Sequence, residues 1–459
     1  MTQLSQVNRW PSPPRAWPVT LHPTTELQQL RDKIVDKTAE IAVVGLGYVG
    51  VPVATSFAAA GFDVVGFDTN RARVVALNRG TLPLATTEPG LEALLQTALT
   101  AGRFRAVHDE AALTERDVAI VAVDTPIDER QRPDARQLVR ACRGLAELAL
   151  RPCLVVIEST VAPRTMRDVI APIFGEGVFL VHCPERVRPG RLLQNLRGMA
   201  RLVGAPNPEV AALATELYRN IVQADLVVTD WETAEVIKTA ENATRDVQIA
   251  LANQLALICD HVGVDFRRVR DQINRLWSDQ PLILDPGPGV GGYCLPKDPW
   301  LLISAVPEGA ASALIEGSRA LNDAMPSHVV DIAEHACQNA GLAIIDATVA
   351  VLGLTYEANS DDQRNAPGPR VAAELERRGA RVVRHDPFVT PERALVDVLH
   401  GSDVAVLVVP HNRYRESDWS ALGGAMRRRV VVDCRRALEA DALRLIGFSY
   451  YALGVAALR

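Results

Sequence analysis

From residue 40 onward, short runs of β-branched and other apolar residues alternate with stretches long enough to form a helix. Runs that are apolar on both faces and separated by helix-length segments are typical of a parallel sheet covered by helices on both sides. In the first half of the chain the candidate strands are residues 41–45, 64–68, 117–123, 154–158, 178–182 and 226–229. The pattern returns at residues 348–353, 380–385, 404–409 and 429–433. We therefore predict an α/β protein with two doubly wound domains.

Between the two patterns lies a stretch with neither glycine nor proline, residues 233–262. Its apolar residues recur with a helical period at Val236, Ile237, Ala240, Val247, Ala250, Leu251, Leu255 and Ile258. This predicts a long central helix that joins the domains and contributes to a homodimer or a larger homo-oligomer. The predicted division is an irregular extension (1–39), a first domain (40–230), a central helical and dimerisation domain (231–328) and a last domain (329–459).

The composition excludes several other classes of protein. The 459 residues carry 49 basic and 55 acidic side chains, and this net charge of −6 argues against a nucleic-acid partner. The longest apolar run, residues 445–458, is shorter than the ~20 residues of a spanning helix, so we expect no membrane partner. Seven cysteines without metal-like spacing predict reduced thiols in a cytoplasmic enzyme and no metal site. Five prolines make residues 1–39 irregular, with Trp10 and Trp17 as candidate contacts to the rest of the chain.

A glycine-rich turn follows the first candidate strand: Gly45-Leu-Gly47-Tyr-Val-Gly50, directly before a helical stretch. Gly45 permits the tight turn, Gly47 lets the backbone approach a pyrophosphate, and Gly50 allows close helix–strand packing. The helix N-terminus offers N–H groups and a positive dipole to the phosphates. Asp68 ends the next strand, where it can accept hydrogen bonds from ribose hydroxyls and repel a 2′-phosphate. The pattern predicts a Rossmann-like domain that prefers NAD to NADP, although two arginines, at positions 71 and 73, lie nearby.

A second glycine-rich segment leads into a cysteine, because residues 287–298 are Gly-Pro-Gly-Val-Gly-Gly-Tyr-Cys-Leu-Pro-Lys-Asp. The glycines let the backbone approach a ligand and leave the Cys294 thiol accessible as a nucleophile toward an aldehyde. Lys297 and Asp298 beside it favour a functional thiol over an inert one. On the central helix, Lys238 and Asn242 share one face and could stabilise an oxyanion. Taken alone, a solvated Lys–Asn pair would be the more common interpretation.

Polar residues also follow two strands of the first domain, at the sheet edge where ligands of doubly wound domains collect. Glu158 and Thr160 follow one of these strands, and Glu185 follows the next. A carboxylate in this place can position water or act as a base. We favour a structural or cofactor-side role for Glu158, and we leave a catalytic role for Glu185 open.

Together and in this order, the motifs resemble those of the UDP-glucose/GDP-mannose dehydrogenase family over residues 40–450. Residues 242–253, 352–356 and 359–364 extend the resemblance. It implies an N-terminal NAD domain, central dimerising helices and a C-terminal, Rossmann-like domain that binds the nucleotide. The implied reaction is a four-electron oxidation of a nucleotide sugar at C6 to a carboxylate, with two NAD⁺ and a cysteine thioester.

The resemblance also implies roles for individual residues. The implied catalytic residues are Cys294, Lys238, Asn242, Asp298, Glu185 and Thr160. The cysteine would be the nucleophile, the lysine and the asparagine would stabilise oxyanions, and the others would act on water during thioester hydrolysis. The implied cofactor contacts are Gly45, Gly47, Tyr48, Val49, Gly50, Asp68, Thr125, Thr160 and Arg364. The implied substrate contacts are Glu185, Arg186, Lys238, Asn242, Gly291 and Tyr356.

The choice of sugar rests on motifs that disagree. Many family members have lysine where Glu357 follows Tyr356, and members with a similar glycine loop carry an arginine upstream, where this chain has Gln280. Because the sequence from Cys294 to Asp298 resembles the glucose branch, we expect UDP- or dTDP-glucose as the substrate. A UDP-N-acetylhexosamine (ManNAc or GlcNAc) is the alternative, and the base, uracil or thymine, stays open. A two-electron dehydrogenase and a non-catalytic nucleotide-sensing protein are less favoured, because this chain retains the cysteine motif.

Overall fold

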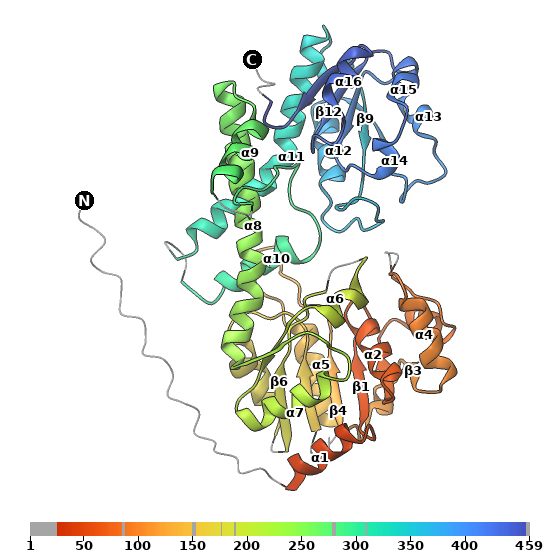
Figure 1. Cartoon of the computed structure of the whole chain (residues 1–459), viewed down its shortest axis with the longest axis vertical. Helices are drawn as coiled ribbons and strands as arrows, with labels where there is room; N and C mark the ends of the chain where they lie inside the picture. Colours follow the sequence, from red (N-terminus) through yellow and green to blue (C-terminus); the bar gives the residue numbers. More distant parts are fainter. Residues whose placement is uncertain are drawn as a thin grey trace, which may run out of the picture.

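The computed structural model describes residues 25–84, 88–148, 153–175, 177–187, 190–277, 281–307, 309 and 311–455. Within these residues it contains an eight-stranded and a five-stranded β-sheet, one in each half of the molecule. A long helix, α8, runs from the N-terminal half to the C-terminal half along one side of the molecule (Figure 1). The predicted α/β class, with two doubly wound domains joined by a long helix, is confirmed. None of the helices in the described ranges is long and apolar enough to span a membrane.

The N-terminal sheet has the strand order β3-β2-β1-β4-β5-β6-β7-β8. Its strands are β1 (Glu40–Val44), β2 (Asp63–Phe67), β3 (Phe104–Val107), β4 (Val118–Val121), β5 (Cys153–Ile157), β6 (Val178–His182), β7 (Arg201–Gly204) and β8 (Leu226–Thr229). All neighbours are parallel except β6 and β7. The order reverses between β1 and β4, so the carboxyl ends of these two strands border the crevice where such sheets bind ligands.

Strands β3 and β7 are not predicted from the sequence. β3 is a short edge strand in which exposed and buried residues alternate, and β7 begins with Arg201. A charged residue argues against a buried strand. In the structure this charge is neutralised by an ion pair with Glu158, which follows β5. The partner lies far away in sequence, so local patterning cannot reveal it.

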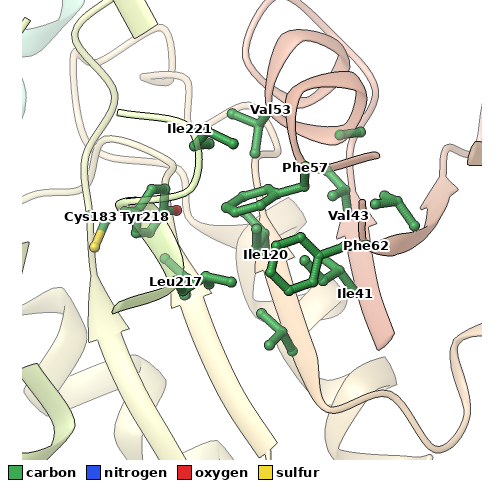
Figure 2. Close-up of a cluster of buried hydrophobic side chains, with 14 of the residues drawn as sticks. Ile41, Val43, Val53, Phe57, Phe62, Ile120, Cys183, Leu217, Tyr218 and Ile221 are labelled. Atoms are coloured by element: carbon green, nitrogen blue, oxygen red, sulfur yellow. The ribbon is translucent and has the colours of Figure 1, made fainter. Parts of the chain in front are cut away.

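Helices cover both faces of the N-terminal sheet. They include α2 (Gly50–Ala59), α3 (Arg71–Asn78), α4 (Leu91–Thr100), α5 (Arg136–Glu147), α6 (Leu192–Gly198) and α7 (Pro208–Tyr218), with the short turns η1 (Glu110–Leu113), η2 (Met166–Ile170) and η3 (Ala171–Ile173). Figure 2 shows the apolar cluster in which Phe57 of α2 lies between the strands and α7. Its ring meets Phe62 and Tyr218 edge-on, with 5.8 Å between ring centroids in each pair. This packing holds α2 against β1, as the glycine turn between them requires.

The prediction of an irregular extension over residues 1–39 is wrong for its last part. Helix α1 spans Thr25–Val35 and packs against α7. Leu27, Leu30 and Ile34 are buried and recur at helical spacing after the last proline of the extension, Pro23. The proline content of the preceding residues concealed this pattern. Residues 1–24, which include both tryptophans, lie outside the described residues.

The central helix α8 spans Trp231–Val262. Asp230 caps its first turn, because its carboxylate accepts a hydrogen bond of 2.7 Å from the Thr233 N–H. Gly263 ends the helix in the left-handed region, with φ of 77°. α9 (Phe266–Trp277) follows, and α8 packs against α10 (Cys294–Ile303) and α11 (Ala313–Asn339).

The contact between α8 and α11 is polar and fully buried. Arg319 of α11 forms an ion pair of 2.6 Å with Asp246 of α8. The Asn322 amide donates to the same carboxylate at 2.9 Å, and the Asn253 amide donates to Asn322 Oδ1 at 2.9 Å. Much of the predicted apolar stripe of α8 faces outward instead, since Val236, Ile237, Leu251 and Ile258 are exposed.

The C-terminal sheet is wholly parallel, with the order β10-β9-β11-β12-β13. Its strands are β9 (Thr348–Leu352), β10 (Arg381–His385), β11 (Val404–Leu407), β12 (Val430–Asp433) and β13 (Ser449–Ala452). Its helices are α12 (Pro367–Arg377), α13 (Leu395–Leu399), α14 (Asn412–Arg415), α15 (Trp419–Ala425) and α16 (Ala440–Leu445), and η4 (Ile344–Asp346) precedes the sheet. Four of the strands are predicted, whereas β13, inside the longest apolar run, is not.

Both sheets use the same turn after the strand that comes first in the chain, β1 or β9. The Leu46 N–H donates to Asp68 at the end of β2 at 2.9 Å, and the Leu354 N–H donates to Asp386 at the end of β10 at 2.7 Å. In each domain, a Cβ on the first glycine of the following helix would collide with the carbonyl of the glycine that opens the turn. The two glycines are residues 45 and 50 in the first turn but 353 and 368 in the second. We call the longer connection, residues 353–366, the β9–α12 loop.

Candidate active site between the two sheets

The glycine turn after β1 has the geometry that a dinucleotide requires. Gly45 has φ of 94° and lies against the Ala122 carbonyl, where a Cβ would not fit. Gly47 has open space where a Cβ would stand, so a pyrophosphate can approach its backbone. The turn leads through Tyr48 and Val49, the residue before α2, into the helix N-terminus. The residues present therefore fit NAD.

Asp68 lies beside this turn, as predicted from the sequence. Its Oδ1 accepts a hydrogen bond of 2.8 Å from the Asn70 N–H, and its Oδ2 pairs with Arg73 at 2.9 Å. The same Oδ2 accepts the Leu46 N–H, so the carboxylate also fixes the shape of the turn. A carboxylate oxygen can accept more than one hydrogen bond, which leaves capacity for ribose hydroxyls.

The glycines before Cys294 are needed for a reason that the sequence did not suggest. We call residues 287–293 the cysteine loop. A Cβ on Gly287 would collide with the Arg435 guanidinium, and a Cβ on Gly291 would collide with Tyr356. Asn253 of α8 accepts a hydrogen bond of 2.8 Å from the Gly287 N–H. The glycines at these positions permit close approach by the rest of the protein, and Gly291 contacts the C-terminal domain.

The cysteine loop brings Cys294 and Asp298, in the first turns of α10, against α8. The Asn242 amide of α8 donates to Asp298 Oδ2 at 2.5 Å. Lys297 pairs with Asp298 Oδ1 at 2.7 Å, and both side chains are buried. The cysteine, the carboxylate and the amide that the sequence singled out in two separate motifs therefore meet at one contact between helices.

Lys238 lies one helical turn before Asn242 and faces the N-terminal sheet. Its Nζ is 3.9 Å from Glu185 Oε1, and both side chains are largely buried. Burial lowers the pKa of Lys238, but the opposing charges of Glu185, Asp298 and Cys294 outweigh this effect and raise it overall. The lysine is therefore a stable cation in contact with a carboxylate.

Two strand ends carry the remaining predicted residues of the first domain. Thr125 Oγ donates to the Thr160 carbonyl at 2.5 Å, which holds the ends of β4 and β5 together. Arg201 donates to the Cys183 carbonyl, just before Glu185, at 3.1 Å and pairs with the buried Glu158. The predicted site residues Thr160 and Glu185 therefore emerge from adjacent strands held by a buried ionic cluster.

Arg186 is engaged with Glu241 and with the backbone of Ala200. Its guanidinium makes two hydrogen bonds, of 2.7 and 3.0 Å, with Glu241 of α8. It also donates to the Ala200 carbonyl at 3.0 Å. In this structure the predicted substrate contact is thus used to hold the segment after Glu185 against α8.

The β9–α12 loop extends the site toward the C-terminal domain. The Arg364 guanidinium lies 4.7 Å from the ring centroid of Tyr48, in the glycine turn, and 5.8 Å from that of Tyr293, in the cysteine loop. Asp362 fixes it through an ion pair of 2.5 Å. The structure therefore brings three predicted cofactor and substrate residues, Tyr48, Arg364 and Tyr356, into one region.

A cavity of about 240 Å³ lies at the carboxyl edge of the C-terminal sheet. It lies where the strand order reverses between β9 and β11. Its lining includes Tyr356, Glu357, Pro367, Val409 and Arg435. The sequence analysis missed Arg435, although its place directly after a predicted strand was the available signal. The position of Gln280, by contrast, lies outside the described residues.

The electrostatics of the site favour a protonated thiol. Burial, followed by the negative charges of Asp298 and Glu185, raises the pKa of Cys294 to about 11, despite the opposing effect of two lysines. The other six cysteines of the chain are buried, whereas Cys294 is partly exposed. Its thiol must lose a proton before it can attack a carbonyl.

We therefore expect iodoacetamide to label Cys294 selectively, and slowly at neutral pH. The rate should rise about tenfold per pH unit from about pH 7 to about pH 10, because only the thiolate reacts. Peptide mapping and a pH series of labelling rates measure both properties, with Cys294→Ala as the unlabelled control. A rate that is already constant at neutral pH would contradict the raised pKa.

Comparison with known proteins agrees with this geometry. The chain matches three profiles of the UDP-glucose/GDP-mannose dehydrogenase family: the NAD binding domain over residues 39–222, the central domain over 232–324 and the UDP binding domain over 350–440. A UDP-N-acetyl-D-mannosamine dehydrogenase of Pyrococcus horikoshii is 36% identical over 423 residues, which cover 90% of this chain and 99% of that protein.

Two further relatives support the match. An NDP-N-acetyl-D-galactosaminuronic acid dehydrogenase of Ralstonia nicotianae is 34% identical over 419 residues, which cover 86% of this chain and 95% of that protein. A solved structure of a UDP-D-ManNAc dehydrogenase from Pyrococcus horikoshii aligns with a TM-score of 0.85 and 33% identity, covering 91% of this chain and all of that one. The chain therefore belongs to the UDP-glucose/GDP-mannose dehydrogenase family, and it is a nucleotide-sugar dehydrogenase with NAD as its cofactor.

Proposed function

We propose that this enzyme oxidises the C6 hydroxyl of a UDP-N-acetylhexosamine, preferably UDP-N-acetylmannosamine, to the uronate through a Cys294 thioester. One observation carries the proposal: a partly exposed thiol lies within the influence of the Lys238 charge, on the helix whose Asp298 binds Asn242 of α8. A two-electron dehydrogenase would have no use for this thiol, and a non-catalytic sensor would need neither the thiol nor the lysine.

Cys294 acts after the alcohol has become an aldehyde. Bound NAD⁺ supplies the hydride acceptor for each of the two oxidations. The Cys294 sulfur bonds to the aldehyde carbon, its proton passes to the Asp298 carboxylate, and a thiohemiacetal oxyanion results. The Lys238 ammonium and the Asn242 amide donate hydrogen bonds to this oxyanion. Loss of a hydride from the same carbon then leaves a thioester.

Hydrolysis of the thioester uses the residues that follow strands β5 and β6 of the N-terminal sheet. Glu185 takes a proton from water, and the resulting hydroxide attacks the thioester carbon. The carbon–sulfur bond breaks, the carboxylic acid loses its proton to solvent and leaves as the uronate, and the Cys294 thiolate regains its proton from Asp298. Glu185 then releases the proton that it took from water to solvent. Thr160 follows the strand next to the one that precedes Glu185, and we assign it a hydrogen bond to the attacking water.

The choice of sugar differs from the expectation of UDP- or dTDP-glucose. The relatives from Pyrococcus horikoshii and Ralstonia nicotianae carry names that specify N-acetylated sugars, which supports the alternative. The sequence around Lys297 had favoured glucose. In the structure the Lys297 ammonium is buried and paired with Asp298. This ion pair accounts for the lysine of the motif without a glucose substrate.

A panel of nucleotide sugars tests the proposal. We expect kcat/KM with UDP-N-acetylmannosamine to exceed that with UDP-glucose or dTDP-glucose by about tenfold or more, because a pocket shaped for the acetamido group holds glucose loosely. NADH release measures each rate. The wild type should form two NADH per uronate, and Cys294→Ala should form no acid, with Cys142→Ala as the control. A glucose nucleotide with the highest kcat/KM would refute this specificity.

Arg435 is a candidate ligand for the diphosphate of the substrate. It lines the cavity, and its guanidinium has no hydrogen bond or ion pair with the residues that the structure describes. Burial without an acidic partner lowers its pKa. Because an anion bound in the cavity would supply the missing partner, we assign the diphosphate to this position.

We expect Arg435→Met to raise KM for the nucleotide sugar by about tenfold or more, the size of a lost charged hydrogen bond. The KM for NAD⁺ should stay within about twofold, because the glycine turn lies in the other domain. Steady-state kinetics with each substrate varied in turn gives both values. Arg384→Met, which removes a surface ion pair with Glu376, is the control. An unchanged sugar KM would exclude this role.

We also propose that α8 pairs with a second copy of the chain. Val236, Ile237, Leu251, Ile258 and Val262 are between 40% and 52% exposed along this helix. Such a row of apolar side chains on one helix supports a homodimeric interface.

Sedimentation velocity should therefore give at least twice the chain mass of 49.8 kDa. The double variant Leu251→Glu/Ile258→Glu should sediment as a monomer, because it places charges in an apolar interface. Leu445→Glu, at an exposed position on the C-terminal domain, serves as the control and should leave the mass unchanged. A monomeric wild type at micromolar concentration would refute the interface.

A further inference from the structure

The cysteine loop is held by two consecutive residues of the C-terminal domain. The Gly292 N–H donates to the Arg364 carbonyl at 2.8 Å. The Asn365 side-chain amide donates to the Gly292 carbonyl at 2.9 Å. Both backbone polar groups of Gly292 are thus bound by the β9–α12 loop. Gly292 lies two positions before Cys294, so this contact lies directly at the start of α10.

The backbone on both sides of this contact is unusual. Gly292 has φ of 83° and Asn365 has φ of 48°, both in the left-handed region. Glycine adopts this region freely, and asparagine tolerates it better than most residues. The neighbouring Gly291 fits only because it lacks a Cβ, which would collide with Tyr356. Glycine at positions 291 and 292 and asparagine at position 365 therefore suit the backbone conformations and the close packing that this contact requires.

We propose that Asn365 is a positioning residue for the catalytic thiol, holding Gly292 so that Cys294 stays aligned with Lys238 and Asn242. The inference rests on the proposed function only in taking Cys294 as the nucleophile. Asn365 acts through Gly292, because its side-chain amide donates its hydrogen bond to the Gly292 backbone carbonyl. The α8 side of the site is held separately, by Asn253 at the start of the cysteine loop. Loss of the Asn365 amide therefore removes one of the two hydrogen bonds that hold Gly292 and leaves the Asn253 contact in place.

Two variants of Asn365 remove its amide donor without straining the backbone. Asn365→Gly keeps the left-handed conformation and deletes the side chain, and Asn365→Asp keeps the shape but removes the donor. Asn359→Gly is the matched control. Asn359 lies in the same loop with φ of 61°, but its side chain accepts a hydrogen bond from Asn412 within the C-terminal domain.

We expect kcat to fall by about fivefold in both Asn365 variants, the size of one lost hydrogen bond. KM for NAD⁺ and for the nucleotide sugar should stay within about twofold, because the deleted amide is engaged with the Gly292 carbonyl and is assigned no ligand contact. In Asn365→Gly, which adds no charge, labelling of Cys294 by iodoacetamide should become several-fold faster at about pH 8, since a loosened loop exposes the thiol to water. Thermal unfolding should match that of Asn359→Gly.

The opposite signs of the two effects, slower turnover and faster labelling, distinguish positioning from a general loss of stability. Labelling needs no substrate, so it tests the inference even if the enzyme oxidises none of the sugars in the panel. If the wild type turns over but both Asn365 variants match Asn359→Gly in kcat and in labelling rate, Asn365 has no positioning role. If labelling changes while no sugar is oxidised, the contact holds and only the proposed function fails.

Discussion

The buried ion pair between Arg319 and Asp246 determines how the two halves of the molecule meet. Breaking a buried ion pair by removing one partner costs about 3–5 kcal/mol, because it leaves an uncompensated charge. The pair is formed only when α8 and α11 lie in one register. Hydrogen bonds connect this ion pair to the cysteine loop. Asn322 donates to Asp246, Asn253 donates to Asn322, and Asn253 also accepts the N–H of Gly287, the first residue of the loop. The same helix carries the lysine and the asparagine that face the thiol, so one polar interface aligns both sides of the active site.

The fold could be predicted largely from the sequence, because buried parallel strands are continuous apolar runs and the glycine turn is a local pattern. The failures have local causes as well. Arg201 concealed β7, since its neutralising partner Glu158 directly follows another strand, β5. Helix α1 was hidden behind a proline-rich segment, although Leu27, Leu30 and Ile34 carry a helical period. For β7 the missing information was a contact with a distant residue, whereas for α1 it was present in the local pattern.

The candidate site was predictable to a similar extent and for the same reason. Lys238 and Asn242 share a helix face by spacing alone, but their contact with Asp298 depends on how α10 packs against α8. Arg435 has no local motif and becomes conspicuous only as a cation that lines a cavity. Arg186 is the opposite case, a residue that was expected to bind a ligand. The family resemblance implied a substrate contact, whereas in the structure its guanidinium binds Glu241. Composition and spacing identify chemical groups, whereas packing decides which of them meet.

The glycine turns after β1 and β9 share one backbone geometry but differ in what they contact. Each turn is fixed by a carboxylate at the end of the next strand, Asp68 or Asp386, and each brings a glycine carbonyl against the following helix. In the first domain the turn is short, and its backbone stays open to a phosphate. In the second domain, residues 354–367 lie between the paired glycines, and they extend out to the thiol segment and to the ring of Tyr48. Because this insertion reaches the cysteine loop, the C-terminal domain forms part of the wall around Cys294, and any movement of that domain would change the access of water to the thiol.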